Sequence, residues 1–121
     1  MDVSKSGRAR TVVVIVTALS LAFVACSSWR EVDVKEAWRS PEGTRVRLLV
    51  GTCNAIRLSS QVQETDAEVR VVVTARGGAK NDCADFLEID LPSPLGSRLL
   101  IDDFDGEPVP VALDQRLPDA Q

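Results

Sequence analysis

Apolar and polar residues alternate with a period of two along most of the chain from Thr44 onward. In TRVRLLV, residues 44–50, the residues Val46, Leu48 and Val50 share one face, and the arginines between them share the other. The same alternation runs through IRLSSQVQE, EVRVVVTA and FLEIDL, and SRLLID and PVPVAL predict two further strands. Successive side chains of a strand point to opposite faces, so each segment has one apolar face to bury. We therefore predict a mainly β domain, an antiparallel sandwich or roll of about six short strands.

The segment before this domain, SSWREVDVKEAWRSPEG, has no single period. Val34, Ala37 and Trp38 have helical spacing, whereas Val32 and Val34 alternate as in a strand. The segment could therefore form a short N-terminal helix or a strand, and the pattern does not decide between them. Ser40-Pro41-Glu42-Gly43 predicts a turn. We expect a lead-in over residues 26–43, the β domain over 44–115 and a frayed tail over 116–121.

The first residues have the composition of an export signal. Lys5, Arg8 and Arg10 precede fifteen residues without a charge, Thr11 to Ala25. This run is shorter than the roughly 18–20 apolar residues that span a bilayer. A basic start followed by a short apolar run indicates a secretory signal peptide over residues 1–25.

The end of this run, Phe23-Val24-Ala25-Cys26, resembles the lipobox of bacterial lipoproteins, with phenylalanine where leucine is usual. The resemblance implies that the Cys26 thiol receives a diacylglycerol, that the chain is cut before it, and that the new amine is acylated. Two or more acyl chains anchor a protein durably. A lipid-anchored protein on the extracytoplasmic face of the cell membrane is the expectation. An uncut anchor and secretion without a lipid are the alternatives.

Two further cysteines, Cys53 and Cys83, remain in the chain. A pair of cysteines in an exported chain predicts a disulfide, and this one would close a loop of about 30 residues. Two separate buried thiols are the alternative.

Charge limits the classes of partner. Without residues 1–25 the chain carries 11 positive and 17 negative side chains, a net charge of −6. The arginines and lysines are spread singly, so nucleic acid is not an expected partner. The same net charge predicts that only the acyl anchor holds the chain to anionic headgroups.

The chain contains no histidine and no tyrosine. Histidine is the usual general base and the usual partner of a serine or cysteine nucleophile, so we predict no catalytic residue, no cofactor and no metal site. The acidic run Asp102–Glu107 imitates part of a calcium loop, but Ile101 and Ala112 occupy the positions of its end ligands. A hairpin turn at Asp105-Gly106 is therefore expected. Beside Cys83, Asp85 is expected to cap a turn.

The segments GTC, QETDAEV, DCAD and PLGSR, over about residues 47–111, resemble small actinobacterial secreted or lipoprotein domains of unknown function. The resemblance implies a compartment and a fold, and no activity. The leading hypothesis is a non-enzymatic, membrane-anchored extracytoplasmic domain that acts in binding or structural support at the cell envelope, with an unknown envelope protein or ligand as partner. The alternatives are a small-ligand carrier and a carboxylate-based hydrolase.

Overall fold

A computed structural model describes residues 28–78 and 83–121 of the chain. In these residues it contains nine strands and no helix. The strands are β1 (Trp29–Val32), β2 (Val34–Arg39), β3 (Arg45–Val50), β4 (Arg57–Glu64), β5 (Glu68–Arg76), β6 (Asp85–Asp90), β7 (Leu99–Asp102), β8 (Glu107–Pro108) and β9 (Val111–Leu113). The mainly β fold predicted from the alternation is therefore confirmed.

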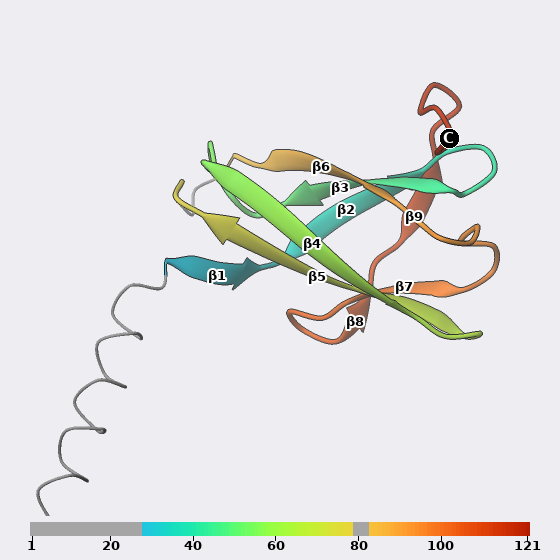
Figure 1. The fold of residues 1–121 in the computed structure, drawn as a ribbon, viewed down its shortest axis with the longest axis horizontal. Helices are drawn as coiled ribbons and strands as arrows, with labels where there is room; N and C mark the ends of the chain where they lie inside the picture. The colour runs from blue at the N-terminus through green and yellow to red at the C-terminus, as the bar shows by residue number, and fades with distance from the viewer. Residues whose placement is uncertain (1–27, 79–82) are drawn as a thin grey trace, which may run out of the picture.

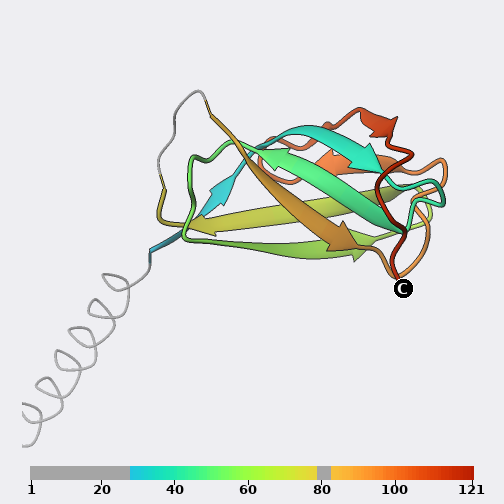
Figure 2. The same ribbon diagram turned by 90° about the horizontal axis from the view of Figure 1, so that it is seen from above.

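The strands form two sheets that pack face to face (Figures 1 and 2). The five-stranded sheet has the order β1-β5-β7-β8, with β4 paired to β5 as well. The four-stranded sheet has the order β6-β3-β2-β9. Only Asp33 separates β1 from β2, so the chain passes from one sheet to the other at this residue.

The core lies between the sheets and is aliphatic. The inward residues of β3 and β5 have no exposed surface: Val46, Leu48, Val50, Val69, Val71, Val73 and Ala75. The alternation assigned all of these except Ala75 to the apolar faces of the two strands. Burying one valine or leucine side chain contributes roughly 1.5–3 kcal/mol, so these two strands supply a large part of the hydrophobic stabilisation.

The sheets are mixed, whereas purely antiparallel pairing was expected. β5 runs parallel to β7, with Val69 opposite Leu100, and β2 runs parallel to β9, with Ala37 opposite Val111. Both pairings join segments far apart in the sequence. A period of two predicts which face a residue occupies, but it does not predict the direction of a neighbouring strand.

The lead-in and the tail belong to the folded domain. The sequence did not decide between a short helix and a strand for this lead-in, and the structure has two strands there, β1 and β2. Their residues Val32, Val34 and Ala37 are buried. The expectation of a frayed tail was wrong, because Leu117 is 1% exposed. Asp119 Oδ1 accepts hydrogen bonds from the Glu42 amide (3.0 Å) and the Thr44 hydroxyl (3.2 Å), so the C-terminal segment is fixed to the β2–β3 turn.

Candidate interaction surface

The disulfide predicted from the sequence is present. Cys53 and Cys83 are bonded, with their Cα atoms 5.4 Å apart, a usual separation for a disulfide. Cys53 follows β3 and is 5% exposed, and Cys83 precedes β6 and is exposed. The bond therefore connects the loop that leads into β4 of one sheet with the start of β6 in the other.

Asp85 reinforces the same junction. Its carboxylate accepts hydrogen bonds from the hydroxyl of Thr52 (2.7 Å) and from the amides of Asn54 (3.2 Å) and Ala55 (3.0 Å). The hydrogen bond from Thr52 is the main cause that lowers the pKa of Asp85, followed by that from Ala55. Asn54 has a φ of +51°, a left-handed conformation that asparagine tolerates. Asp85 was expected to cap a turn beside Cys83; its carboxylate instead caps the loop at residues 52–55, and these hydrogen bonds fix the first residue of β6.

The outer face of the four-stranded sheet carries an aromatic–arginine cluster of Trp38, Arg47 and Phe86. Arg47 lies opposite Trp38 of β2 and opposite Glu88 of β6. Phe86 is opposite Leu49, so it is the diagonal neighbour of Arg47, and Trp38 lies on the strand beyond. The two ring centroids are 6.1 Å apart, and the guanidinium carbon of Arg47 lies 5.9 Å from the Phe86 centroid. Both distances are in the range of weakly attractive aromatic and cation–π contacts.

Two carboxylates hold the Arg47 side chain in place, one from β6 and one just after β9. It forms an ion pair with Glu88 at 2.8 Å and a longer one with Asp114 at 3.7 Å. These pairs are partly exposed, so each adds little stability, about 0–1 kcal/mol. Their effect is to orient the guanidinium against the Phe86 ring.

The aromatic side chains of the described residues all lie at the surface. Phe86 is 62% exposed, Phe104 48% and Trp29 42%, and Trp38 is partly exposed. Aromatic side chains normally contribute most to a core, because each buries about 150–250 Å². Here the core contains valine, leucine, isoleucine and alanine, and the aromatic area remains on the surface.

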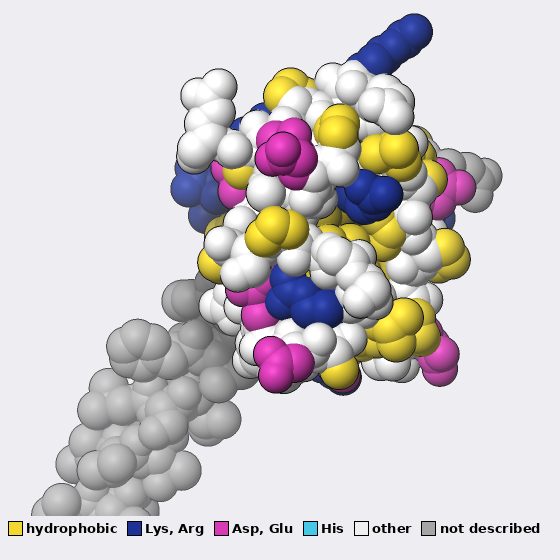
Figure 3. All heavy atoms as spheres, turned by 90° about the vertical axis from the view of Figure 1, so that its right-hand side faces the viewer, with side chains coloured by type: hydrophobic (Ala, Val, Ile, Leu, Met, Phe, Trp, Pro, Cys, Tyr) yellow, Lys and Arg dark blue, Asp and Glu magenta, His cyan; other side chains and the backbone are white. Residues whose placement is uncertain are grey.

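A shallow depression of about 330 Å³ borders the cluster at Trp38. It lies between β2 and β9 and is lined by Glu36, Ala37, Trp38, Pro110, Val111 and Ala112. A second depression, of about 310 Å³, lies on the other side of β9 and shares Pro110 and Val111 with the first. The end of the sandwich in Figure 3 mixes hydrophobic, basic and acidic side chains, and neither sign of charge dominates it.

The acidic run Asp102–Glu107 forms the β7–β8 hairpin, as expected, with Gly106 at a φ of +75°. Asp102 is 1% exposed, and its two carboxylate oxygens accept hydrogen bonds from the amides of Val34 (2.9 Å) and Phe104 (3.1 Å). Burial raises the pKa of Asp102. In the described residues no group of three or more acidic or cysteine side chains is arranged to hold a metal ion. The carboxylate of Asp102 serves the fold by joining β7 to β2.

Cys26, the residue predicted to carry the lipid, lies outside the described residues. Within residues 28–78 and 83–121, no helix is long and apolar enough to span a membrane.

The aromatic–arginine cluster was not predicted from the sequence. The alternation puts Arg47 and Phe86 on outward faces, but only the register of β2, β3 and β6 brings them together. Comparisons with protein-family models, with curated proteins and with solved structures found no match to this chain. Its function is therefore argued from its own residues.

Proposed function

We propose that this chain is a non-enzymatic, lipid-anchored extracytoplasmic domain that binds a partner at the cell envelope through the outer face of its four-stranded sheet. The observation that carries the proposal is the aromatic–arginine cluster of Trp38, Arg47 and Phe86 on this face. Tryptophan and arginine are enriched among the residues that contribute most to protein–protein binding. Phe86 adds a large apolar area, since 62% of it is exposed.

The rigidity of the cluster supports this role. Trp38, Arg47 and Phe86 stand on three adjacent strands, and the disulfide and the Asp85 hydrogen bonds fix the start of β6 next to Phe86. Side chains placed on strands lose little conformational freedom when a partner binds. The depression beside Trp38 gives the partner a concave feature next to the exposed rings.

The anchor rests on the N-terminal sequence. Cys26 follows the uncharged run that ends at Ala25, and β1 begins three residues after Cys26. A lipid on Cys26 holds the domain at the membrane surface, which raises the local concentration of the domain toward any partner in the same envelope.

The experiment uses the acylated protein in intact cell envelopes, with a photoactivatable crosslinking residue in place of Leu49. Two double variants of this protein are compared. Trp38→Ala/Phe86→Ala removes the rings of the cluster. Leu99→Ala/Phe104→Ala removes two apolar side chains of the other sheet and its β7–β8 hairpin, which are 55% and 48% exposed. We expect a crosslinked product that the first variant loses and the second keeps. The same product from both variants would contradict binding through this face.

The hydrolase alternative would need a pair of carboxyls, and the candidate pair among the described residues is Glu31 and Asp103. A hydrogen bond with Asp103 raises the pKa of the Glu31 carboxyl, and burial raises it further. Glycoside cleavage, however, requires two carboxyls about 5–9.5 Å apart with the scissile bond between them, and a hydrogen-bonded pair is closer than this. Hydrolysis of a chromogenic glycoside that Glu31→Gln abolishes would replace the binding proposal with this one.

The depression beside Trp38 is the observation that favours the ligand-carrier alternative. Its test is a screen of small ligands by thermal unfolding, in which a ligand stabilises the parent protein but not a variant with Val111→Arg. A ligand found in this way would assign the depression rather than the cluster as the binding site.

A further inference from the structure

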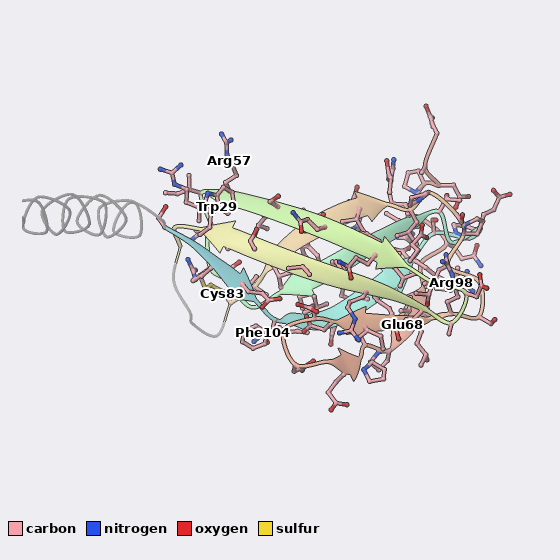
Figure 4. The ribbon with its side chains drawn as sticks, turned by 60° about the horizontal axis from the view of Figure 1, so that its bottom comes forward. Trp29, Arg57, Glu68, Cys83, Arg98 and Phe104 are labelled. Atoms are coloured by element: carbon pink, nitrogen blue, oxygen red, sulfur yellow. A yellow bond between two sulfur atoms is a disulfide. The ribbon has the colours of Figure 1, made fainter. Side chains whose placement is uncertain are left out.

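Three residues form a row across one end of the five-stranded sheet. Arg76 of β5 lies directly opposite Trp29 of β1 on one side and directly opposite Arg57 of β4 on the other. Ala75 and Val73 of β5 point into the core with no exposed surface, so Arg76 and its two neighbours occupy the outer face. Figure 4 shows Trp29 and Arg57 at the same end of the sandwich, where the chain enters β1.

Neither Arg57 nor Arg76 forms an ion pair with a carboxylate of the described residues. Like charges directly opposite each other on adjacent strands are destabilising. Ion pairs with carboxylates are formed, by contrast, by Arg45, Arg47, Arg70 and Arg98. The next row along the sheet contains one carboxylate, that of the half-buried Glu31, opposite Thr74.

Two exposed apolar side chains belong to the same end. Ile56 precedes Arg57 and is 79% exposed, the largest exposed fraction of the exposed large hydrophobic side chains. Its side chain lies over Gly77, where an added Cβ would be 2.6 Å from Ile56 Cδ1. Trp29, at 42% exposure, is at the other end of the row. Tryptophan beside basic residues is the combination found where proteins meet the interface of a bilayer.

The position of the row along the chain points to the same surface. Trp29 is three residues after Cys26, and an extended chain spans at most about 3.6 Å per residue, so their Cα atoms lie within about 11 Å. The uncharged run of residues 11–25 ends just before Cys26. A group buried in a membrane at Cys26 therefore holds the row within reach of the lipid headgroups.

We propose that Trp29, Ile56, Arg57 and Arg76 form a membrane-contacting rim that seats this end of the five-stranded sheet on anionic phospholipid headgroups. The inference rests on the lipid-anchored function proposed above. Without residues 1–25 the chain has a net charge of −6. Salt screens the interaction between exposed charges beyond about 8–10 Å, so the arginines of the rim determine the electrostatic attraction at the contact. The aromatic–arginine cluster is on the four-stranded sheet, whereas the rim is on the five-stranded sheet. Contact of the rim with the membrane therefore leaves the cluster facing away from the membrane.

The two tryptophans of the chain provide the test, because Trp29 lies in the rim and Trp38 in the cluster. The acylated protein that begins at Cys26 is reconstituted into vesicles of phosphatidylcholine with phosphatidylglycerol. Trp38→Phe leaves Trp29 as the reporter, and Trp29→Phe leaves Trp38. Quenching by lipids with brominated acyl chains measures depth, and quenching by acrylamide measures exposure to water. We expect brominated lipids to quench Trp29 at least three-fold more strongly than Trp38, and acrylamide to show the reverse order.

Arg57→Gln/Arg76→Gln, placed in the Trp38→Phe chain, tests the electrostatic part. Each arginine near an anionic surface changes the contact equilibrium by about five-fold. We therefore expect the seated population to fall by up to about 25-fold, with more quenching of Trp29 by acrylamide. The variant also removes a like-charge pair, so it should unfold at the same temperature or higher. Lys35→Gln/Arg116→Gln is the charge-matched control and should leave the quenching of Trp29 unchanged.

Flotation of the vesicles separates the two proposals. Protein that does not float with the vesicles contradicts the lipid anchor itself. Protein that floats with Trp29 as accessible to acrylamide as Trp38 overturns the rim and leaves the anchor intact. Equal effects of the arginine variant and the control variant would also overturn the rim.

Discussion

The buried hydroxyl of Thr52 donates a 2.7 Å hydrogen bond to the carboxylate of Asp85, beside the disulfide that joins the two sheets. Thr52 precedes Cys53, and Asp85 is two residues after Cys83. The same junction is thus held by a covalent bond and by hydrogen bonds to one carboxylate. The predictions for the two can be separated, because only the carboxylate responds to pH.

Asp85→Ala should lower the free energy of unfolding by roughly 1–3 kcal/mol at neutral pH, because it leaves the Thr52 hydroxyl buried without an acceptor. The folded state lowers the pKa of Asp85. Its contribution is therefore present above the ordinary value of 3.8 and is lost as the pH falls through the lowered value. Urea unfolding at pH 7 and pH 3 measures both effects. Asp90→Ala on the same strand, whose side chain is 58% exposed, should cost less than about 1 kcal/mol. Equal losses for both variants would argue against the cap.

Cys53→Ala/Cys83→Ala should lower the free energy of unfolding by roughly 2–5 kcal/mol, because the disulfide limits the conformations of the unfolded chain. The bond closes a loop over a sequence separation of 30 residues. Denaturant unfolding of the oxidised protein and of the variant measures the difference. The parent protein, alkylated after denaturation without reductant, should show no label on either cysteine, and labelling of both would contradict the bond.

Leu117→Ala should cost about 2–4 kcal/mol, as expected for a large side chain removed from a site with 1% exposure. Thermal unfolding with Leu113→Ala as the control checks this, since Leu113 is 44% exposed and should change the stability by less than about 0.5 kcal/mol. A loss of less than about 1 kcal/mol for Leu117→Ala would show that the C-terminal segment does not close the core.

Glu31→Gln should stabilise the protein at neutral pH by less than about 1 kcal/mol, because it removes a charge that faces Asp103 and Asp102 across a partly exposed surface. The folded state raises the pKa of Glu31 above its ordinary value of 4.5. The favourable contribution of the protonated form is thus complete below 4.5 and is lost as the pH rises through the raised value. The advantage of the glutamine variant should therefore appear above that window and vanish below pH 4. An advantage that is the same at all pH values would contradict the carboxyl pair.

The protein extracted from membranes should begin at Cys26 and carry the mass of a diacylglycerol, as mass spectrometry of the intact chain and of its N-terminal peptide can show. Cys26→Ala should leave the precursor uncut, because the thiol is the atom that receives the lipid. Cys53→Ala/Cys83→Ala should keep the lipid mass and serves as the control. A mature N-terminus at another residue would rule out this processing.

The alternation predicted the central strands because each has one buried face. It failed at β2 for a physical reason. The register of β2 on β3 shifts between Val34 and Glu36, and this bulge puts Val34 and Ala37 on the inner face three residues apart. Three residues is also the spacing of one helical face, so the pattern could not separate a helix from a bulged strand.

Leu117 and the candidate surface depend on contacts between distant segments. Leu117 is a single apolar residue in a polar segment, and no period marks it as buried. The contact between Trp38 and Phe86 depends on how β2, β3 and β6 are aligned, and one sequence does not fix that alignment. Asp85 was predictable in part, because aspartate is a common turn residue. Its partners were not, since Thr52, Asn54 and Ala55 lie 30 or more residues before it.

Because β2 pairs with β9, the four-stranded sheet can be completed only late during synthesis. Residues 37–39 have their final neighbours only when residues 111–113 have been made, and Thr44 is held by Asp119. Most of the chain leaves the ribosome before the four-stranded sheet can be completed. Long-range pairing of this kind also slows folding. A nascent chain that stays incompletely folded until residues 111–113 have been made suits a translocation channel, which requires an extended polypeptide.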